Sequence, residues 1–280
     1  MGFTKYIHQE GKMSKIGFFG AGNMGLPILK AAVKLLGAQE VGFFEKNDTR
    51  AEYVTGLTAA KRYESEEALV KDCEYILFAV KPQMASAVFE KVAPVITEKN
   101  RFVSIMAGVT TDRIREAIGT KAPIVRLMPN TPAMVSEGMT SMCLSGCDSD
   151  SAEAKFVESL CCSFGRVVLL PESLMSAATC ANGSSPAYVY MFIEALADGV
   201  VKYGIPRDTA YILAAQTVLG SAKMVLESGE HPAKLKDNVC SPGGTTIAAV
   251  EALEANGFRN AILKATAACY DKGVELSKVK

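Results

Sequence analysis

A chain of 280 residues, 49% of them hydrophobic, is long enough to fold as two domains with separate cores. Its 30 Lys and Arg residues balance 30 Asp and Glu residues, and no block of like charge runs beyond about a pair, so we expect no nucleic-acid partner and no polybasic membrane patch. No apolar run approaches the roughly 18 residues of a membrane-spanning helix, so no membrane span is expected.

The cysteine pattern indicates a reduced protein without a metal site. Cys143 and Cys147 are four residues apart, but none of the other six cysteines completes a zinc-type set. A chain of this length does not need disulfides, so free thiols and a cytoplasmic location are expected. Residues 1–12 lack the apolar core of a signal peptide, and we interpret them as a leader, either an upstream start or an expression remnant, ahead of Met13.

Short apolar runs alternate with helical periods in the first part of the chain. The first helix is predicted at residues 23–36. Strands are predicted at residues 15–19, 41–44, 75–80, 102–106, 124–128, 139–145 and 166–170. Strands that alternate with helices form a parallel sheet covered on both faces, so we predict a doubly wound, mostly parallel α/β domain over residues 13–171.

After Pro171 the pattern becomes helical throughout. Four segments have a helical period and are rich in Ala, Leu, Met and Val, namely residues 184–203, 207–228, 245–255 and 257–276. Their breaks fall at clusters of glycine and proline. We therefore predict an all-helical domain over residues 172–280. Its helices either pack against another subunit or form a self-contained bundle, and the pattern fits both.

The sequence Gly20-Ala21-Gly22-Asn23-Met24-Gly25 lies between the first strand and the first helix. In this context the first glycine permits a tight turn, the second lets the backbone approach a pyrophosphate, and the third lets the helix pack on the strand. The helix N-terminus adds unpaired N–H groups that favour phosphate charge. We predict dinucleotide binding at Gly20, Gly22, Asn23, Met24 and Gly25.

The residues after the second strand bear on the choice between NADH and NADPH. Glu45 lies twenty residues after Gly25, where a carboxylate can bond the ribose hydroxyls of NADH and repel the 2′-phosphate of NADPH. Lys46 and Arg50 follow and could pair with that phosphate. The pattern favours NADH weakly and leaves NADPH open.

Loops at the carboxyl ends of later strands are expected to face the same crevice. Those after two of the strands supply further cofactor candidates: Ala79, Val80, Lys81, Pro82, Ala107 and Gly108. In a third loop, Pro129 and Pro132 flank Asn130 and Thr131, which present an amide and a hydroxyl. Asn130 is therefore a candidate for contact with the substrate.

Several longer motifs resemble one family. In the second half they are residues 183–188, 194–199, 204–207, 216–217, 235–239, 241–246 and 257–259, and in the first half residues 79–83, 107–109 and 128–132. Together they resemble the pyrroline-5-carboxylate reductases over about residues 15–276. The chain departs from that family at Asn182 and Ser185, where the family usually reads Ser-Gly-Ser-Gly-Pro across residues 182–186, so the shape of this turn is expected to differ.

The resemblance implies a Rossmann-type domain followed by a helical domain that forms a homodimer, often within larger rings such as a decamer. It implies transfer of hydride from NADPH or NADH to the imine of 1-pyrroline-5-carboxylate, which yields L-proline in the last step of proline biosynthesis. The active site would lie between the cofactor domain and helices that include the partner's. Thr246 would bond the ring nitrogen, and the loop formed by Ser241, Gly243, Gly244 and Thr245 would hold the substrate carboxylate.

The residues themselves fit this chemistry. A helix that begins after Gly243 and Gly244 offers bare N–H groups to a carboxylate, although Ser241 or Thr245 could instead cap it. Oxidation of a hydroxy acid needs a base, whereas an imine nitrogen is already basic and needs only polarisation and placement. A β-hydroxyacid dehydrogenase would carry a catalytic lysine on the helix after residue 183, and residues 184–201 contain none. A redox sensor that binds the dinucleotide without turnover is the other alternative.

Overall fold

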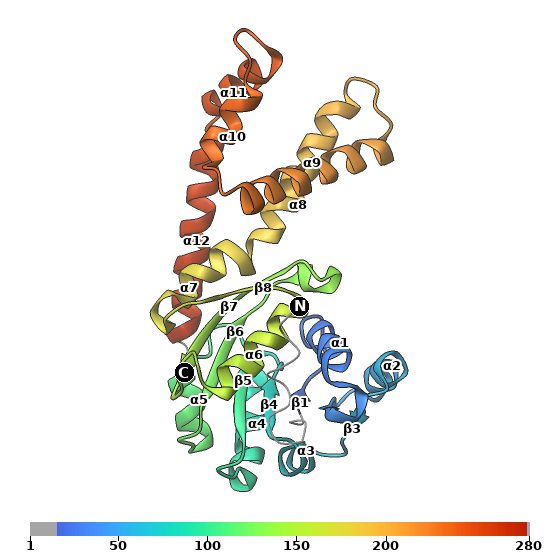
Figure 1. The fold of residues 1–280 in the computed structure, drawn as a ribbon, viewed down its shortest axis with the longest axis vertical. Helices are drawn as coiled ribbons and strands as arrows, with labels where there is room; N and C mark the ends of the chain where they lie inside the picture. Colours follow the sequence, from blue (N-terminus) through green and yellow to red (C-terminus); the bar gives the residue numbers. More distant parts are fainter. Residues whose placement is uncertain (1–15, 279–280) are drawn as a thin grey trace. The chain divides into compact units, whose positions relative to one another are not determined.

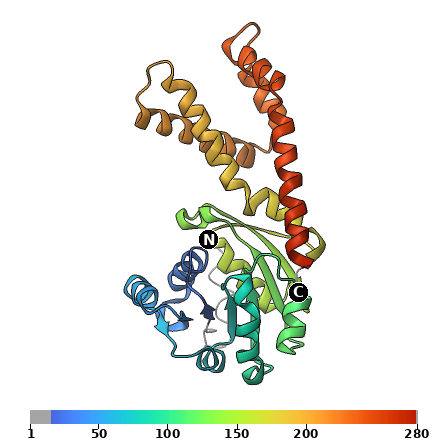
Figure 2. The same ribbon diagram turned by 180° about the vertical axis from the view of Figure 1, so that it is seen from behind.

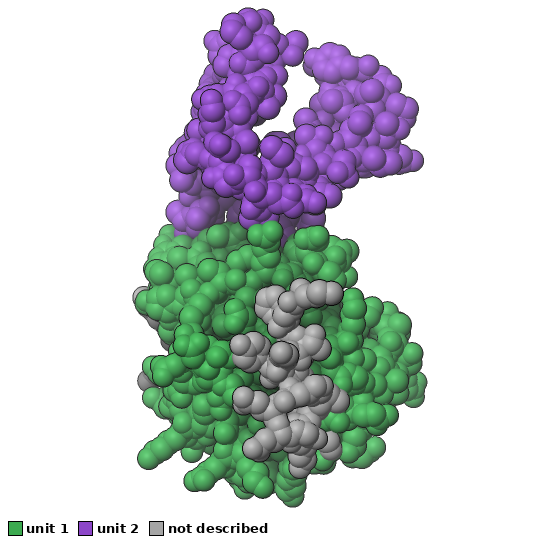
Figure 3. Space-filling model, viewed as in Figure 1, with its two compact units in different colours: residues 1–184, 270–280 green, residues 185–269 purple. Residues whose placement is uncertain are grey.

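A computed structural model describes residues 16–278, and the chain within this range divides into two compact units (Figure 3). Unit 1 comprises the described residues up to Ser184 together with the end of the last helix from Tyr270, and unit 2 comprises Ser185–Cys269. The leader at residues 1–12 lies outside the described residues. The predicted domain boundary after residue 171 stays a prediction, and residues 172–184 pack with unit 1.

Unit 1 contains one sheet of eight strands in the order β3-β2-β1-β4-β5-β6-β7-β8 (Figure 1). The strands are β1 (Ile16–Phe19), β2 (Val41–Phe44), β3 (Lys61–Arg62), β4 (Tyr75–Phe78), β5 (Arg101–Ser104), β6 (Ile124–Met128), β7 (Gly138–Ser145) and β8 (Gly165–Leu169). All neighbouring strands are parallel except β6 and β7, which are antiparallel. The strand order reverses between β1 and β4, and in such sheets the crevice at this point binds ligands.

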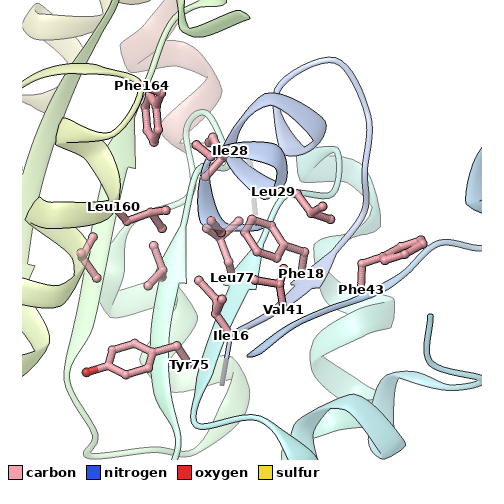
Figure 4. Close-up of a cluster of buried hydrophobic side chains, with 14 of the residues drawn as sticks. Ile16, Phe18, Ile28, Leu29, Val41, Phe43, Tyr75, Leu77, Leu160 and Phe164 are labelled. Atoms are coloured by element: carbon pink, nitrogen blue, oxygen red, sulfur yellow. The ribbon is translucent and has the colours of Figure 1, made fainter. Parts of the chain in front are cut away.

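Helices cover both faces of the sheet because buried strand residues alternate between them (Figures 1 and 2). The helices are α1 (Gly25–Leu36), α2 (Asp48–Thr58), α3 (Glu66–Asp72), α4 (Ala85–Val92), α5 (Thr111–Ile118), α6 (Ala152–Cys162) and α7 (Met175–Ala178). Ile16 and Phe18 of β1 pack with α1, α2 and α6 in one core (Figure 4). Phe19 points to the opposite face and packs with α3, α4 and α5 in a second core.

Unit 2 consists of helices. They are α8 (Ser185–Val201), α9 (Arg207–Ser228), α10 (Pro232–Val239), α11 (Thr245–Ala255) and the first part of α12 (Phe258–Lys278). The buried cluster of this unit comprises Ala197, Ala210 and Ala214, where α8 packs on α9. Within the described residues, α9 alone is long and apolar enough to span a bilayer by length and composition. Its most apolar stretch of 18 residues has a mean hydropathy of 1.2, and 11% of that stretch is buried.

The predicted fold class is confirmed. The strands predicted at residues 41–44 and 124–128 match β2 and β6 to the residue, as do the helices at 207–228 and 245–255. The strand predicted at 75–80 ends at Phe78, since Ala79 and Val80 already belong to the turn that follows. The first helix begins at Gly25 and not at residue 23, because Asn23 and Met24 form the turn.

Candidate functional site

A cavity of about 250 Å³ lies at the carboxyl ends of β1, β2 and β4 in unit 1. The cavity contains seven of the residues predicted to bind the cofactor: Gly20, Gly22, Glu45, Lys46, Ala79, Val80 and Lys81. Its remaining walls come from Phe19, Phe44, Glu66, Met84 and Val88. These seven predicted residues thus line one cavity, which lies where the strand order reverses.

The glycine loop has a backbone that side chains would obstruct. Gly20 has φ +89°, a conformation that favours glycine, and its N–H donates to the carbonyl of Phe44 at 3.0 Å. A Cβ at Gly25 would lie 2.6 Å from the carbonyl oxygen of Gly20, so the close approach of α1 to the loop requires a residue without a side chain. This cradle fits a pyrophosphate, because the backbone is open at Gly22, where a Cβ would meet nothing within 4 Å.

Glu45 connects the end of β2 to the glycine loop. Its carboxylate accepts hydrogen bonds from the N–H groups of Ala21 and Asn47, each at 3.2 Å. These bonds hold the carboxylate in the wall of the cavity, next to the glycine loop. Its contact with the ribose hydroxyls stays a prediction.

The two cations considered for a 2′-phosphate lie in different places. Lys46 lines the cavity beside Glu45. Arg50 lines a neighbouring hollow of about 540 Å³, where its Nε donates to the carbonyl of Ala21 at 2.8 Å and its guanidinium lies 5.2 Å from the centre of the Tyr53 ring. Of the two, Lys46 is the cation that a ligand in the cavity would meet.

The other predicted cofactor residues lie outside the cavity wall. Asn23 lines the same neighbouring hollow as Arg50, and Met24 precedes the first turn of α1. Pro82 begins a 3₁₀ turn, Pro82–Met84, which carries Met84 into the cavity. Ala107 and Gly108 form the turn after β5, where Gly108 has φ +74° and faces Leu276 of α12. Their cofactor contacts stay predictions.

Two asparagines tie the end of β6 to the start of β7. The side-chain oxygen of Asn130, which is 8% exposed, accepts from the N–H of Met139 at 2.9 Å. Asn182 lies in a π-helical turn, Thr179–Gly183, and its amide donates to the carbonyls of Met128 and Met139 at 2.7 and 3.0 Å. Asn130 thus has a structural role here, and its contact with the substrate stays a prediction. Asn182 is one of the two departures from the family pattern. Its amide donates two hydrogen bonds, whereas the hydroxyl of a serine in this place could donate only one.

The predicted substrate loop lies in unit 2. Gly243 has φ +68°, and the N–H of Gly244 donates to the carbonyl of Ser241 at 3.0 Å, which closes a tight turn before Thr245 begins α11. Gly244 is the N-cap of α11, and among the described residues no side chain caps this helix end. The alternative in which Ser241 or Thr245 caps the helix is therefore not adopted. The turn leaves Ser241 and Thr245 exposed and Thr246 half-buried.

Glu66 is a cavity residue that the sequence analysis missed. Its side chain is 3% exposed, and both carboxylate oxygens accept from Nζ of Lys91 at 3.1 Å. The local sequence signals only a helix start, because Ser65 caps α3 and acidic residues commonly follow such a cap. Placing Glu66 in the cavity depends on the packing of α3 against β2 and α4, which no local pattern reveals.

A separate polar cluster lies between β6, β7 and the segment after β8. The buried Arg126 of β6 pairs with Glu172, which also accepts a hydrogen bond from the hydroxyl of Thr111 at 3.3 Å. The Cys143 thiol donates to the same carboxylate at 3.2 Å, and burial together with Glu172 raises the pKa of Cys143 to about 12. A thiol with so high a pKa is a poor nucleophile at neutral pH, so Cys143 is not a candidate catalytic residue.

Comparison with known proteins gives one consistent result. A family model described as pyrroline-5-carboxylate reductase dimerisation matches residues 172–276, and one described as NADP oxidoreductase, coenzyme F420-dependent, matches residues 15–108. The pyrroline-5-carboxylate reductase of Escherichia coli is 43% identical over 269 residues, which cover 94% of this chain and 98% of that protein. The Pisum sativum reductase is 39% identical over 266 residues, which cover 94% and 96%.

Solved structures agree with these relatives. The Plasmodium falciparum pyrroline carboxylate reductase with NADP bound has a TM-score of 0.85 at 31% identity, and the match covers 95% of this chain and 98% of that one. A pyrroline-5-carboxylate reductase from Coxiella burnetii has a TM-score of 0.87 at 30% identity, with coverage of 95% and 99%.

Proposed function

The chain belongs to the pyrroline-5-carboxylate reductase family, and from this premise we propose how its residues divide the work of binding and reduction. The enzyme is an NAD(P)H-dependent oxidoreductase that reduces the imine of 1-pyrroline-5-carboxylate to give L-proline. The observation that carries this function is a sequence identity of 36–43% over nearly the whole chain to reductases of bacterial, plant and animal origin.

The cavity in unit 1 binds the adenosine part of the cofactor. The loop from Gly20 to Gly25 holds the pyrophosphate, and Glu45 bonds the adenosine ribose. Lys81 lies beside the same ribose or its phosphate. This assignment is supported by the open backbone at Gly22 and by the position of the Glu45 carboxylate against the N–H of Ala21. The bound nicotinamide supplies the hydride.

The turn before α11 binds the substrate carboxylate. Gly243 and Gly244 bring the helix N-terminus close to a ligand, and the first N–H groups of α11 favour negative charge. Support comes from Gly244 at the N-cap, where no side chain of the described residues competes with a ligand for these groups.

Thr246 is the proposed catalytic residue. It lies in the first turn of α11, so its hydroxyl projects from the same helix end that holds the carboxylate. By donating to the imine nitrogen, the hydroxyl polarises the C=N bond and orients the ring for attack at carbon. The nitrogen then takes its proton from water, and no base is required. Asn130 is proposed as a further substrate contact from unit 1.

The apolar surface of unit 2 is proposed to be a subunit interface. Helix α9 exposes Ile212 and Leu213, and such a surface suits another protein chain as well as lipid. The match to a dimerisation model over residues 172–276 favours a second copy of this chain. The assembly is thus a homodimer, or a ring of dimers such as a decamer, in the cytoplasm.

NADH is proposed to be favoured modestly over NADPH, by about tenfold or less. The carboxylate of Glu45 would repel a 2′-phosphate, and the compensating charges in the cavity wall, Lys46 and Lys81, are exposed side chains whose ion pairs contribute only about 0–1 kcal/mol. An assay of 1-pyrroline-5-carboxylate with NADH and NADPH in parallel tests both the activity and this preference. Absence of turnover with both cofactors contradicts the activity, and a strong preference for NADPH contradicts the proposed role of Glu45.

A further inference from the structure

The wall of the proposed cofactor cavity includes one buried carboxylate that has no role in the proposed binding of the pyrophosphate or the ribose. Glu66 is 2% exposed yet forms part of the cavity wall. It lies at the start of α3, apart from the glycine loop and from Glu45. A ligand that fills the cavity therefore lies against the wall to which Glu66 belongs.

Lys91 holds the Glu66 carboxylate in place without occupying all of its acceptor sites. Both carboxylate oxygens accept from Lys91 Nζ at 3.1 Å, and the lysine itself is 46% exposed. A carboxylate has about four lone-pair sites on its two oxygens, so one ammonium leaves room for another donor. Lys91 itself is not part of the cavity wall, whose cations are Lys46 and Lys81. Glu66 is therefore a preorganised acceptor in the wall of the cavity.

Apolar side chains share the cavity wall with Glu66. Val80, Met84 and Val88 are among them, and Val88 lies one turn before Lys91 on α4. Apolar side chains beside a carboxylate suit a flat aromatic base that carries an exocyclic amino group, because the ring packs on the apolar wall while the N–H donates to the carboxylate. Among the parts of a dinucleotide cofactor, only adenine has that combination at the end remote from the reaction.

We propose that Glu66 reads the 6-amino group of the cofactor's adenine and thereby selects adenine over other purine bases. This inference rests on the proposed use of the cavity by NADH or NADPH. A base with a 6-oxo group, such as hypoxanthine, presents an acceptor to the carboxylate, so the hydrogen bond is lost and two acceptors face each other. Discrimination by a charged buried acceptor is expected to be at least about tenfold in affinity.

The test compares NADH with reduced nicotinamide hypoxanthine dinucleotide, and NADPH with its own hypoxanthine analogue. Dissociation constants come from fluorescence titration, which does not need turnover, and kcat and KM come from the reduction of 1-pyrroline-5-carboxylate. The wild-type protein should bind the adenine forms at least about tenfold more tightly. The difference should appear in KM and not in kcat, because the base is remote from the hydride.

Two matched variants separate base reading from a structural role. In Glu66→Gln, an amide can turn to donate to a 6-oxo group or to accept from a 6-amino group, so the preference should fall to about twofold or less. In Glu67→Gln, the same charge is removed from the same helix turn but outside the cavity wall, so the wild-type preference should remain. Loss of the preference in both variants would point to a change in α3 and overturn the proposal.

The outcomes also distinguish this inference from the proposed function. Equal affinity of the wild-type protein for the adenine and hypoxanthine forms overturns the role of Glu66, whether or not the variants fold and whatever the turnover. Selective binding of the adenine forms without reduction of the imine supports the role of Glu66 and contradicts the proposed function.

Discussion

The two units distribute their apolar residues in opposite ways. Unit 1 buries Phe18, Phe43 and Phe78 almost completely between its sheet and helices. In the described residues of unit 2, the buried hydrophobic residues are three alanines, whereas Ile212 is 70% exposed and Leu263 is 69% exposed. A large exposed apolar surface marks an interaction site. Unit 1 therefore completes its core within one chain, whereas the exposed apolar side chains of unit 2 fit the dimerisation that its family model describes.

This contrast divides the reaction as well. The proposed cofactor cavity belongs to the unit whose core is closed, and the proposed substrate loop belongs to the unit whose apolar side chains are exposed. Cofactor affinity should then depend on packing within the chain, whereas turnover should depend on the assembly. Four experiments test whether the two units differ in this way.

The largest effect is expected for thiol reactivity inside the closed unit. Burial raises the pKa of Cys143 to about 12, so at pH 8 only about one thiol in 10⁴ is ionised. Alkylation of Cys143 by iodoacetamide should be on the order of 10³-fold slower than that of an unperturbed thiol, and should accelerate as the pH rises toward 12. Peptide mass spectrometry after timed alkylation measures this rate. Rapid labelling at pH 8 would show that the region around β7 opens readily.

Removal of the Thr246 hydroxyl should have the next largest effect. In Thr246→Ala, kcat should fall about 10²-fold or more, because the imine nitrogen loses its donor, while the dissociation constant for NADH should hardly change. Thr266→Ala is a matched control, since its hydroxyl bonds only the carbonyl of Ile262 within α12. Wild-type turnover in the Thr246 variant would remove this residue from the mechanism.

A charge on the exposed face of α9 should weaken assembly. The wild-type protein should elute at twice its 29.8 kDa or more. Ile212→Glu should weaken subunit association by tens of fold, about 2 kcal/mol, because burying an isoleucine contributes roughly that much and a buried charge costs more. Leu57→Glu, at a 47% exposed leucine of unit 1, is the control. Analytical ultracentrifugation measures both. A fully active monomer would contradict a shared active site.

The smallest effect is expected for a single methyl group in the glycine loop. In Gly25→Ala, the new Cβ would lie 2.6 Å from the carbonyl oxygen of Gly20, so the loop must shift and NADH binding should weaken about tenfold. Gly56→Ala places a methyl group on α2, where nothing lies within 4 Å, and should leave binding unchanged. Equal affinity of both variants would mean that the loop is more adaptable than its packing suggests.

Local sequence patterns predicted most of the sheet because its strands are buried apolar runs. The pattern failed at β3, where Lys61 and Arg62 form a two-residue edge strand with no apolar signal. It also failed at α10, a short helix that begins at Pro232 and buries no residue. Such elements depend on the strand they pair with or the helices they connect, and the periodicity of their own residues does not reveal either.

The candidate site was predictable to the extent that backbone motifs define it. The glycine loop and the loop after β4 lie together as expected, since both follow adjacent parallel strands. Glu66 and the separate location of Arg50 were not predictable, because both depend on how helices pack beside the sheet. A carboxylate between two polar residues looks the same in sequence whether it is solvated or buried.

The amide of Asn182 constrains how this chain can diverge. It donates to two backbone carbonyls, those of Met128 and Met139, and so joins two strands through one side chain. The serine that the family usually carries at this place has a single hydroxyl proton and can serve only one of them. An exchange in either direction therefore demands a compensating change in the neighbouring strands. Residue 182 and the β6–β7 junction should thus evolve as an epistatic unit, with single replacements counter-selected and paired replacements tolerated.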